Sequence, residues 1–470
     1  MNKLKKLASD TVLFTISNFS SKLLVFLLIP LYTSQLTTEE MGIADLITNV
    51  VNFVFPIMTM SLIEAVLRFS FEDKYDKRQL FSNTIKVSFL GFIILLLLSP
   101  IATKVQGVFF DNWYAFITLF LGFALSNTVS NYLKGCNKTK EIAVFGVIQT
   151  IMTIALNIIF IVLLKMGIKG YILSLVCSYY VSTALIVIIT KLYRDFMLFN
   201  TDFAVLKDMI SYSMPIIPSK IAWWVNNSAD KYFIIYTIGI AGSGLYGVAH
   251  KIPSIITTMA DIFNQAWQIS AIDTYVKNGA DDSFYNDIHR YFLQFVLVAS
   301  SFVVIFSEIF GMLLFKGDFL VAWKYIAPLV VSAAFACFSG FYHSIFRAAM
   351  LAKELSYSVL IGSVVNISLN YPMIKIFGII GAAYATMIAF AVEWIFSYYI
   401  AKRAVYLSEI PVKTVITTLL LIIECFIMCN DVTNKYYISI LIIIAILFLS
   451  IDLIKEVISI VLKLCKRVKK

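Results

Sequence analysis

Long apolar runs, separated by short polar connections, recur along the whole chain. A helix of about 20 apolar residues crosses a hydrocarbon core about 30 Å thick, and most of these runs reach that length. The pattern predicts an all-α polytopic membrane protein with about 14 transmembrane helices, at residues 11–33, 42–66, 81–101, 113–133, 142–164, 169–190, 211–237, 243–267, 289–311, 325–346, 355–376, 379–401, 412–430 and 436–456.

Composition agrees with this pattern. Of the 470 residues, 60% are hydrophobic and 14% are charged, whereas an ordinary soluble domain has about a quarter charged residues. No stretch is left over for a separate soluble domain.

The basic start and the apolar run after it are also features of signal peptides. The run is too long for one and no small-residue cleavage site follows, so we expect it to be the first span.

The net charge of +10 is explained better by membrane topology than by nucleic-acid binding. Most of the 38 Lys and Arg residues lie at the two ends of the chain and in every second connection. Because cytoplasmic loops carry an excess of Lys and Arg, this asymmetry predicts that both termini are cytoplasmic.

Short motifs recur in the two halves of the chain. Ser21-Lys22, Lys140-Glu141 and Leu156-Asn157 in the first half correspond to Ser219-Lys220, Lys353-Glu354 and Leu369-Asn370 in the second. They predict two parallel six-helix lobes, residues 1–195 and 196–405, followed by two C-terminal helices and a basic tail in residues 406–470. In transporters built from such repeats, the substrate path lies where the repeats meet.

The seventh predicted span carries a polar stripe. Lys220, Trp224, Asn227, Asp230 and Lys231 follow helical spacing, so they share one face. A charged residue at the centre of a membrane helix costs roughly 2.5–3.5 kcal/mol, which makes a wet, functional cavity one explanation. The other is polar packing between helices, since Asn and Ser also line packed helix interfaces.

Further charges lie in the eighth span. His250 and Lys251 are expected at about the same depth as Asp230 and Lys231, and Asp261 follows on the same span. These five residues are candidates for gating or coupling, and an Asp230–Lys251 ion pair would serve equally well as a structural clamp.

The first lobe offers a matching cation. Asn18 and Lys22 lie near the middle of the first span, and Lys22 is the repeat equivalent of Lys220. A cavity lined by both lysines favours an anionic substrate. Phosphate or pyrophosphate oxygens accept strong charge-assisted hydrogen bonds, so we expect Lys22, Lys220, Asn18, Trp224 and Asn227 to bind such a group.

Signatures of catalysis are missing from the sequence. The chain lacks a G-x-x-x-x-G-K-[ST] nucleotide loop, an H-E-x-x-H zinc pair and a G-x-S-x-G nucleophile elbow. Its six cysteines are scattered without metal-ligand spacing. We therefore predict a protein that is not an enzyme and uses no metal or cofactor, with transport driven by an ion gradient or a coupled substrate gradient.

Several stretches resemble the Wzx-type polysaccharide flippases. They are LLVFLLIPLYTSQLTTEEMGIADLI, TKEIAVFGVIQT, SYSMPIIPSKIAWWVNNSADKYFIIYTIGIAGSGLYGVAHKIPSII and FNQAWQISAI, and the resemblance extends over spans 1 to 12. These flippases belong to the superfamily that also holds multidrug and toxic compound extruders and lipid II flippases.

The resemblance implies twelve core helices plus two, and transfer of an undecaprenyl-pyrophosphate-linked oligosaccharide from the cytoplasmic to the outer leaflet by alternating access. It places the protein in a bacterial cytoplasmic membrane, in capsule, exopolysaccharide or O-antigen assembly, with membrane lipid, a polysaccharide polymerase and export machinery as partners. Lys22 and Lys220 would receive the pyrophosphate. Lipid II flippases favour arginines in that cavity, and this chain has lysines.

Three alternatives remain at this point. A cation-coupled multidrug extruder would carry an acid deep in the first lobe, where this chain has Lys22. A lipid II-type flippase shares the expected fold. A membrane glycosyltransferase or polymerase would need a sizeable acidic outer loop, which the short predicted outer connections do not supply.

Overall fold

Helices make up the described part of the protein. The computed structural model describes residues 26, 28–72, 74–102, 104–105, 107–197, 202–278, 284–349, 351–430 and 432–451, and every regular element in these ranges is helical. Ten of these helices are long and apolar enough to cross a membrane, and α13 (Ile240–Ala249) and α21 (Lys435–Leu449) are shorter apolar helices. The predicted all-α polytopic architecture is confirmed.

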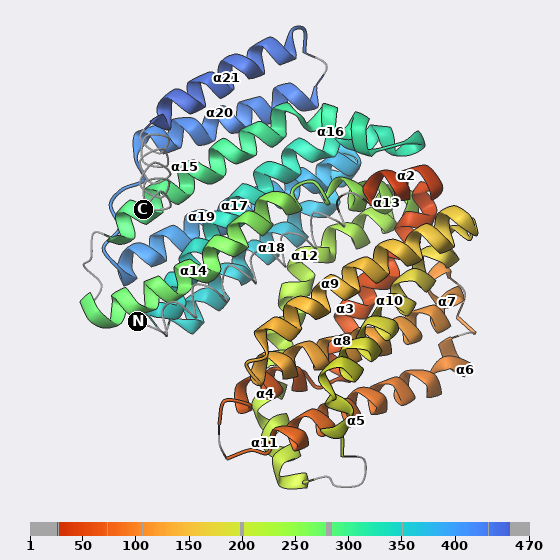
Figure 1. Cartoon of the computed structure of the whole chain (residues 1–470). Coiled ribbons are helices and arrows are strands. Elements are labelled where there is room, and N and C mark those ends of the chain that lie inside the picture. Colours follow the sequence, from red (N-terminus) through yellow and green to blue (C-terminus); the bar gives the residue numbers. More distant parts are fainter. Residues whose placement is uncertain are drawn as a thin grey trace, which may run out of the picture. The chain divides into compact units, whose positions relative to one another are not determined.

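The described chain packs into two units (Figure 1). Unit 1 extends to Ser228 and includes Ile240–Gly244, and unit 2 comprises Ala229–Gly239 and the residues from Leu245 onward. One helix, α12 (Ile217–Thr237), therefore contributes its first half to unit 1 and its second half to unit 2. The predicted lobe boundaries at residues 195 and 405 stay predictions.

Unit 1 begins with short α2 and then alternates long helices with short turns. Besides the first halves of α12 and α13, its elements are α2 (Ile29–Gln35), α3 (Thr38–Met58), α4 (Leu62–Phe69), α5 (Lys77–Leu97), α6 (Ser99–Ala102), α7 (Val108–Asp111), α8 (Trp113–Gly135), α9 (Thr139–Asn157), the π-helix η1 (Ile158–Leu163), α10 (Gly167–Thr190), the 3-10 turn η2 (Leu192–Arg194), α11 (Phe203–Ser213) and the 3-10 turn η3 (Met214–Ile216).

Helix α8 is the centre of unit 1, since α3, α4, α5, α9 and α10 all pack on it. At one end Leu62, Leu80 and Leu133 are fully buried together, and at the other Phe116 and Phe120 are buried. Thr37 starts α3 with a reciprocal cap, in which its hydroxyl accepts from the Glu40 amide and the Glu40 carboxylate accepts from the Thr37 amide.

The prediction of one continuous span over residues 42–66 was wrong. Helix α3 ends at Met58, and α4 starts at Leu62 after a turn in which Met60 and Ser61 adopt positive φ angles of 48° and 50°. Non-glycine residues rarely adopt this conformation, and apolar periodicity carries no signal for it. Glu64 therefore lies on α4, a helix separate from α3.

Close helix contact in unit 1 depends on Gly91 of α5. A Cβ atom at this position would lie 2.6 Å from the Met58 carbonyl oxygen, so the backbones of α3 and α5 would have to separate. We expect Gly91→Ala to destabilise the protein by about 1–3 kcal/mol, the usual cost of overpacking. Thermal unfolding in detergent measures this. Gly340→Ala is the control, because its Cβ would lie 3.2 Å from the Asn264 amide nitrogen, which is the movable end of a side chain. An equal loss of stability in both variants would contradict the prediction.

Unit 2 holds the remaining long helices. Besides the second halves of α12 and α13, its elements are α14 (Ser254–Asn278), α15 (Phe284–Ile305), α16 (Ser307–Leu314), the 3-10 segment η4 (Gly317–Tyr325), α17 (Ile326–Ala348), α18 (Ala352–Phe377), α19 (Ile379–Ala404), α20 (Val412–Cys429) and α21.

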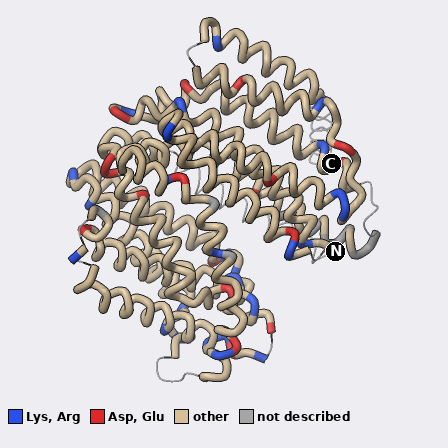
Figure 2. The backbone as a smooth tube through the Cα atoms, turned by 180° about the vertical axis from the view of Figure 1, so that it is seen from behind, with Lys and Arg blue, Asp and Glu red and all other residues tan. Residues whose placement is uncertain are grey.

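Helix α17 forms the core of unit 2 and packs against α14, α15, α19 and α20. Helices α17 and α19 pack against each other, and each buries small residues, including Ala333 and Ala334 on α17 and Ala382 and Ala385 on α19. Small residues let helices approach closely within a membrane. Helices α20 and α21 lie side by side (Figure 1). Within each unit, charged residues gather mostly near the helix ends (Figure 2), as expected for helices that cross a membrane.

A second predicted span, residues 243–267, is also divided. Helix α13 ends at Ala249 and α14 begins at Ser254, with His250, Lys251 and Pro253 in the turn between them. Proline lacks a backbone N–H and clashes with the preceding helical turn, so α13 does not continue through Pro253. The turn places His250 and Lys251 at a helix junction instead of inside a continuous span.

Candidate functional site

Asp230 of α12 is the centre of a buried polar cluster in unit 2. Its side chain is 5% exposed. The Tyr246 hydroxyl donates to Asp230 Oδ2 over 2.8 Å, the Asn370 amide donates to Oδ1 over 2.8 Å, and the Thr386 hydroxyl lies 2.5 Å from Oδ2. Four helices, α12, α13, α18 and α19, thus meet at one carboxylate whose partners among the described residues are all neutral.

The cluster has more oxygen acceptors than protons to fill them. Thr386 Oγ1 lies within hydrogen-bond distance of both Asp230 Oδ2 and the Ala382 carbonyl, at 2.5 and 3.0 Å, but has a single proton. Asn366 Oδ1 accepts from the Asn370 amide over 2.9 Å. The Asn370 side-chain oxygen is buried without a hydrogen-bond partner in the described chain. Buried polar atoms are normally satisfied, and this oxygen can accept one further hydrogen bond or coordinate a cation.

The donor set fits a monovalent cation or a proton. Carboxylate, amide and hydroxyl oxygens are the ligands that hard cations prefer. One carboxylate balances one positive charge, and the described residues hold no group of three or more His, Cys, Asp or Glu side chains that would suit a multivalent metal ion. Such a cation would be held by Asp230, Asn366, Asn370 and Thr386. Binding or release of the cation would change the net charge at the point where four helices meet.

Only part of this cluster had a signal in the sequence. Asp230 stood out as a deep charge, and Asn370 belonged to the repeated Leu-Asn motif. Asn366 lies one helical turn before Asn370, a spacing that could have marked both. Tyr246 and Thr386 had no distinguishing pattern, because a single hydroxyl on an apolar helix is common in membrane proteins.

The other proposed gating residues lie on α12, at the break between α13 and α14, and on α14. Lys231 is half-buried beside Asp230 on α12. His250 is exposed at the end of α13, with its ring centre 6.2 Å from that of Tyr246, which bonds to Asp230. Lys251 is half-buried in the turn, and Asp261 is exposed on α14. The structure thus places His250 beside Tyr246, a hydrogen-bond partner of Asp230, and a gating role for these residues stays a prediction.

Lys220, the proposed phosphate-binding cation, lies in unit 1 and is paired. Its ammonium is 2.7 Å from the Glu64 carboxylate of α4, and 47% of the Lys220 side chain stays exposed. Glu64 also interacts electrostatically with Lys134 at the end of α8. Nothing in the sequence pairs Glu64 with Lys220, because the two residues lie far apart in the chain.

Trp224 and Asn227 lie on the same half of α12. The Trp224 indole donates to the Asn49 carbonyl over 2.8 Å and its ring lies 4.6 Å from that of Phe53, so this side chain anchors α12 to α3. Asn227 is exposed and its amide donates to the Trp223 carbonyl over 2.7 Å. The predicted polar stripe therefore divides, with Lys220, Trp224 and Asn227 in unit 1 and Asp230 in unit 2. The remaining predicted residues, Asn18 and Lys22, lie outside the described residues.

Comparison with known sequences shows the family to which the chain belongs. A profile of the family described as polysaccharide biosynthesis protein matches residues 7–268, more than half of the chain. The chain belongs to this family. The matched range contains both Lys220 and Asp230. An uncharacterised membrane protein of Methanocaldococcus jannaschii is 23% identical over 402 residues, which cover 81% of this chain and 94% of the relative.

Solved structures share the fold. The lipid II flippase MurJ in an inward closed conformation matches with a TM-score of 0.72 and 16% identity, over 95% of this chain and all of that chain. An inward-facing multidrug resistance MATE transporter of the MOP superfamily matches with a TM-score of 0.65 and 15% identity, over 83% of this chain and 97% of that one. This member of the polysaccharide biosynthesis family therefore shares its multi-helix fold with these flippase and multidrug transporter structures.

Proposed function

We propose that the protein is a flippase that moves undecaprenyl-pyrophosphate-linked oligosaccharides from the cytoplasmic to the outer leaflet by alternating access. The observation that carries this proposal is the family match over residues 7–268, since the family is described by polysaccharide biosynthesis. The membrane would be a bacterial cytoplasmic membrane with both termini of the chain in the cytoplasm. The product would enter capsule, exopolysaccharide or O-antigen assembly, with a polysaccharide polymerase and export machinery downstream.

Binding of the substrate headgroup is assigned to unit 1. Lys220 keeps about half of its side chain exposed while paired with Glu64, and Asn227 is exposed about two helical turns further along α12. A pyrophosphate carries more negative charge than a carboxylate and accepts several charge-assisted hydrogen bonds, so it competes with Glu64 for the ammonium. Lys22 and Asn18 of the first span would supply the corresponding groups.

Energy coupling is assigned to the Asp230 cluster. Asp230 of α12 is hydrogen-bonded to α13, α18 and α19, and binding of a monovalent cation or a proton would neutralise the carboxylate at this junction. A ligand shifts a conformational equilibrium only if it binds one state more tightly, and a site built from four helices meets that requirement when one helix moves. Lys231, His250, Lys251 and Asp261 are the proposed gating residues around it.

Deletion of the gene in its native host tests the proposed substrate class. We expect loss of a surface polysaccharide and accumulation of its lipid-linked repeat unit, with restoration by the wild-type gene and not by Lys220→Gln. Arrested peptidoglycan synthesis with lysis would instead identify a lipid II-type flippase. Unchanged polysaccharide together with new sensitivity to cationic dyes would identify a multidrug extruder, and either result would overturn the proposal.

A further inference from the structure

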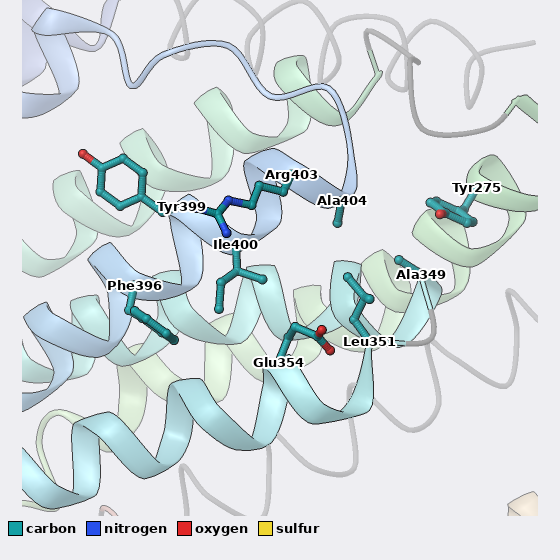
Figure 3. Close-up of a pocket in the computed structure, with 9 residues that line it drawn as sticks. All are labelled: Tyr275, Ala349, Leu351, Glu354, Phe396, Tyr399, Ile400, Arg403 and Ala404. Carbon is teal, nitrogen blue, oxygen red and sulfur yellow. The ribbon is translucent and has the colours of Figure 1, made fainter.

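A pocket of about 540 Å³ lies at one end of the helical bundle of unit 2. It is formed where α17 and α19 end and α18 begins, and α14 contributes Tyr275 (Figure 3). Helices α17, α18 and α19 are all long and apolar enough to cross a membrane. A pocket at their ends therefore lies at the boundary between the hydrocarbon core and water.

Two opposite charges line this pocket without being paired. Glu354, in the first turn of α18, is half-buried, and Arg403, in the last turn of α19, is exposed. The structure gives neither side chain a hydrogen bond or ion pair among the residues that it describes. Figure 3 shows them on different helices with Ile400 between them. Each charge lies at the helix end where the helix dipole favours its sign.

The rest of the lining is apolar or aromatic. Leu351, Phe396 and Ile400 contribute carbon surface, and Tyr275 adds an aromatic ring with a polar end. Aromatic rings with a polar end are typical of the membrane interface. The combination of an anion site, a cation site and carbon surface at a membrane boundary matches an amphipathic molecule whose headgroup carries both charges.

We propose that this pocket binds a phospholipid with a primary ammonium in its headgroup, as in phosphatidylethanolamine. Arg403 pairs with the phosphate, Glu354 accepts hydrogen bonds from the ammonium, and the acyl chains lie against Phe396 and Ile400. A headgroup with phosphate alone would leave Glu354 facing a second anion. A choline headgroup has the positive charge but no N–H to donate. The inference does not depend on which substrate the protein transports.

Headgroup selectivity tests this site in the whole protein. Delipidated wild type is offered an equal mixture of phosphatidylethanolamine, phosphatidylcholine and phosphatidylglycerol with identical acyl chains, and retained lipid is counted by native mass spectrometry. We expect about tenfold preference for phosphatidylethanolamine, the effect of a charge-assisted hydrogen bond. Retention should fall stepwise through the N-monomethyl and N-dimethyl headgroups. Equal retention of all headgroups by wild type would overturn the proposal.

Two substitutions locate the selectivity. Glu354→Gln should bind ethanolamine and choline lipids equally, while Arg403→Gln should lose affinity for all three lipids. The controls are Glu409→Gln, which removes an exposed carboxylate paired with Lys402 at 2.8 Å, and Arg194→Gln, which removes an exposed guanidinium in unit 1. Both controls should behave like wild type. Unchanged selectivity in Glu354→Gln would contradict the assignment of the ammonium to this pocket.

Discussion

Replacing Asp230 with asparagine is expected to abolish the stimulation of transport by a cation gradient. The substitution keeps the size of the side chain and one acceptor oxygen, which can keep the hydrogen bond from either Tyr246 or Asn370. It removes the negative charge that a cation or proton would neutralise. Coupling free energies of about 1–3 kcal/mol correspond to rate or affinity changes of about 5–150-fold, and we expect a loss within this range. Proteoliposomes with imposed sodium, potassium or proton gradients measure it and identify the ion.

Glu424→Gln is the matched control for Asp230→Asn. Glu424 is also a fully buried acid of unit 2, and it accepts a hydrogen bond from Ser301 over 2.6 Å on other helices. Its amide variant should respond to the gradient like wild type. Asn370→Ala should weaken cation dependence as well, because it removes the buried amide oxygen that has no partner in the described chain. Full gradient response in Asp230→Asn would exclude the cluster as the coupling site.

Lys220→Gln is expected to reduce transport of the lipid-linked substrate by at least about tenfold, the loss of one strong charge-assisted contact. Glu64→Gln should have the opposite effect on substrate binding, because the Lys220 ammonium, 2.7 Å from Glu64, would no longer be held by a carboxylate. Initial transport rates over a range of substrate concentrations separate weaker binding from slower turnover.

A charge exchange distinguishes this role from a purely structural ion pair. If the Glu64–Lys220 pair only holds α4 and α12 together, the double variant Glu64→Lys with Lys220→Glu should recover the activity that each single variant loses. If Lys220 binds the substrate phosphate, the exchanged pair stays inactive although the protein folds. Recovery to the wild-type rate in the exchanged variant would refute the phosphate-binding assignment.

Much of the fold could be predicted from apolar run length because membrane spans need little else to be recognised. The breaks could not. Met60 and Ser61 adopt left-handed backbone conformations within a largely apolar stretch, and nothing in its sequence marks a helix end. Pro253 was visible in the sequence, but a proline also occurs within continuous helices of this chain, as at Pro56 and Pro372. Proline alone therefore did not decide between a bend and a break.

The charged residues of the candidate site could be predicted from the sequence, but the side chains that bond to them could not. Asp230 and Lys220 stood out because ionisable residues are costly within membrane spans. Glu64, Tyr246 and Thr386 were missed because their roles arise from packing between helices distant in sequence. The division of α12 between two units also had no sequence signal, since one amphipathic stripe runs through both halves.

Transfer of a lipid-linked glycan between leaflets tests the central proposal most directly. Purified protein is reconstituted into vesicles that contain a fluorescent undecaprenyl-pyrophosphate oligosaccharide, and a membrane-impermeant quencher reports how fast the labelled glycan changes leaflet. We expect transfer to be much faster than in protein-free vesicles, to increase with a cation gradient and to lose that increase in Asp230→Asn. Transfer no faster than in protein-free vesicles, with expulsion of a cationic dye from the same preparation, would contradict the account.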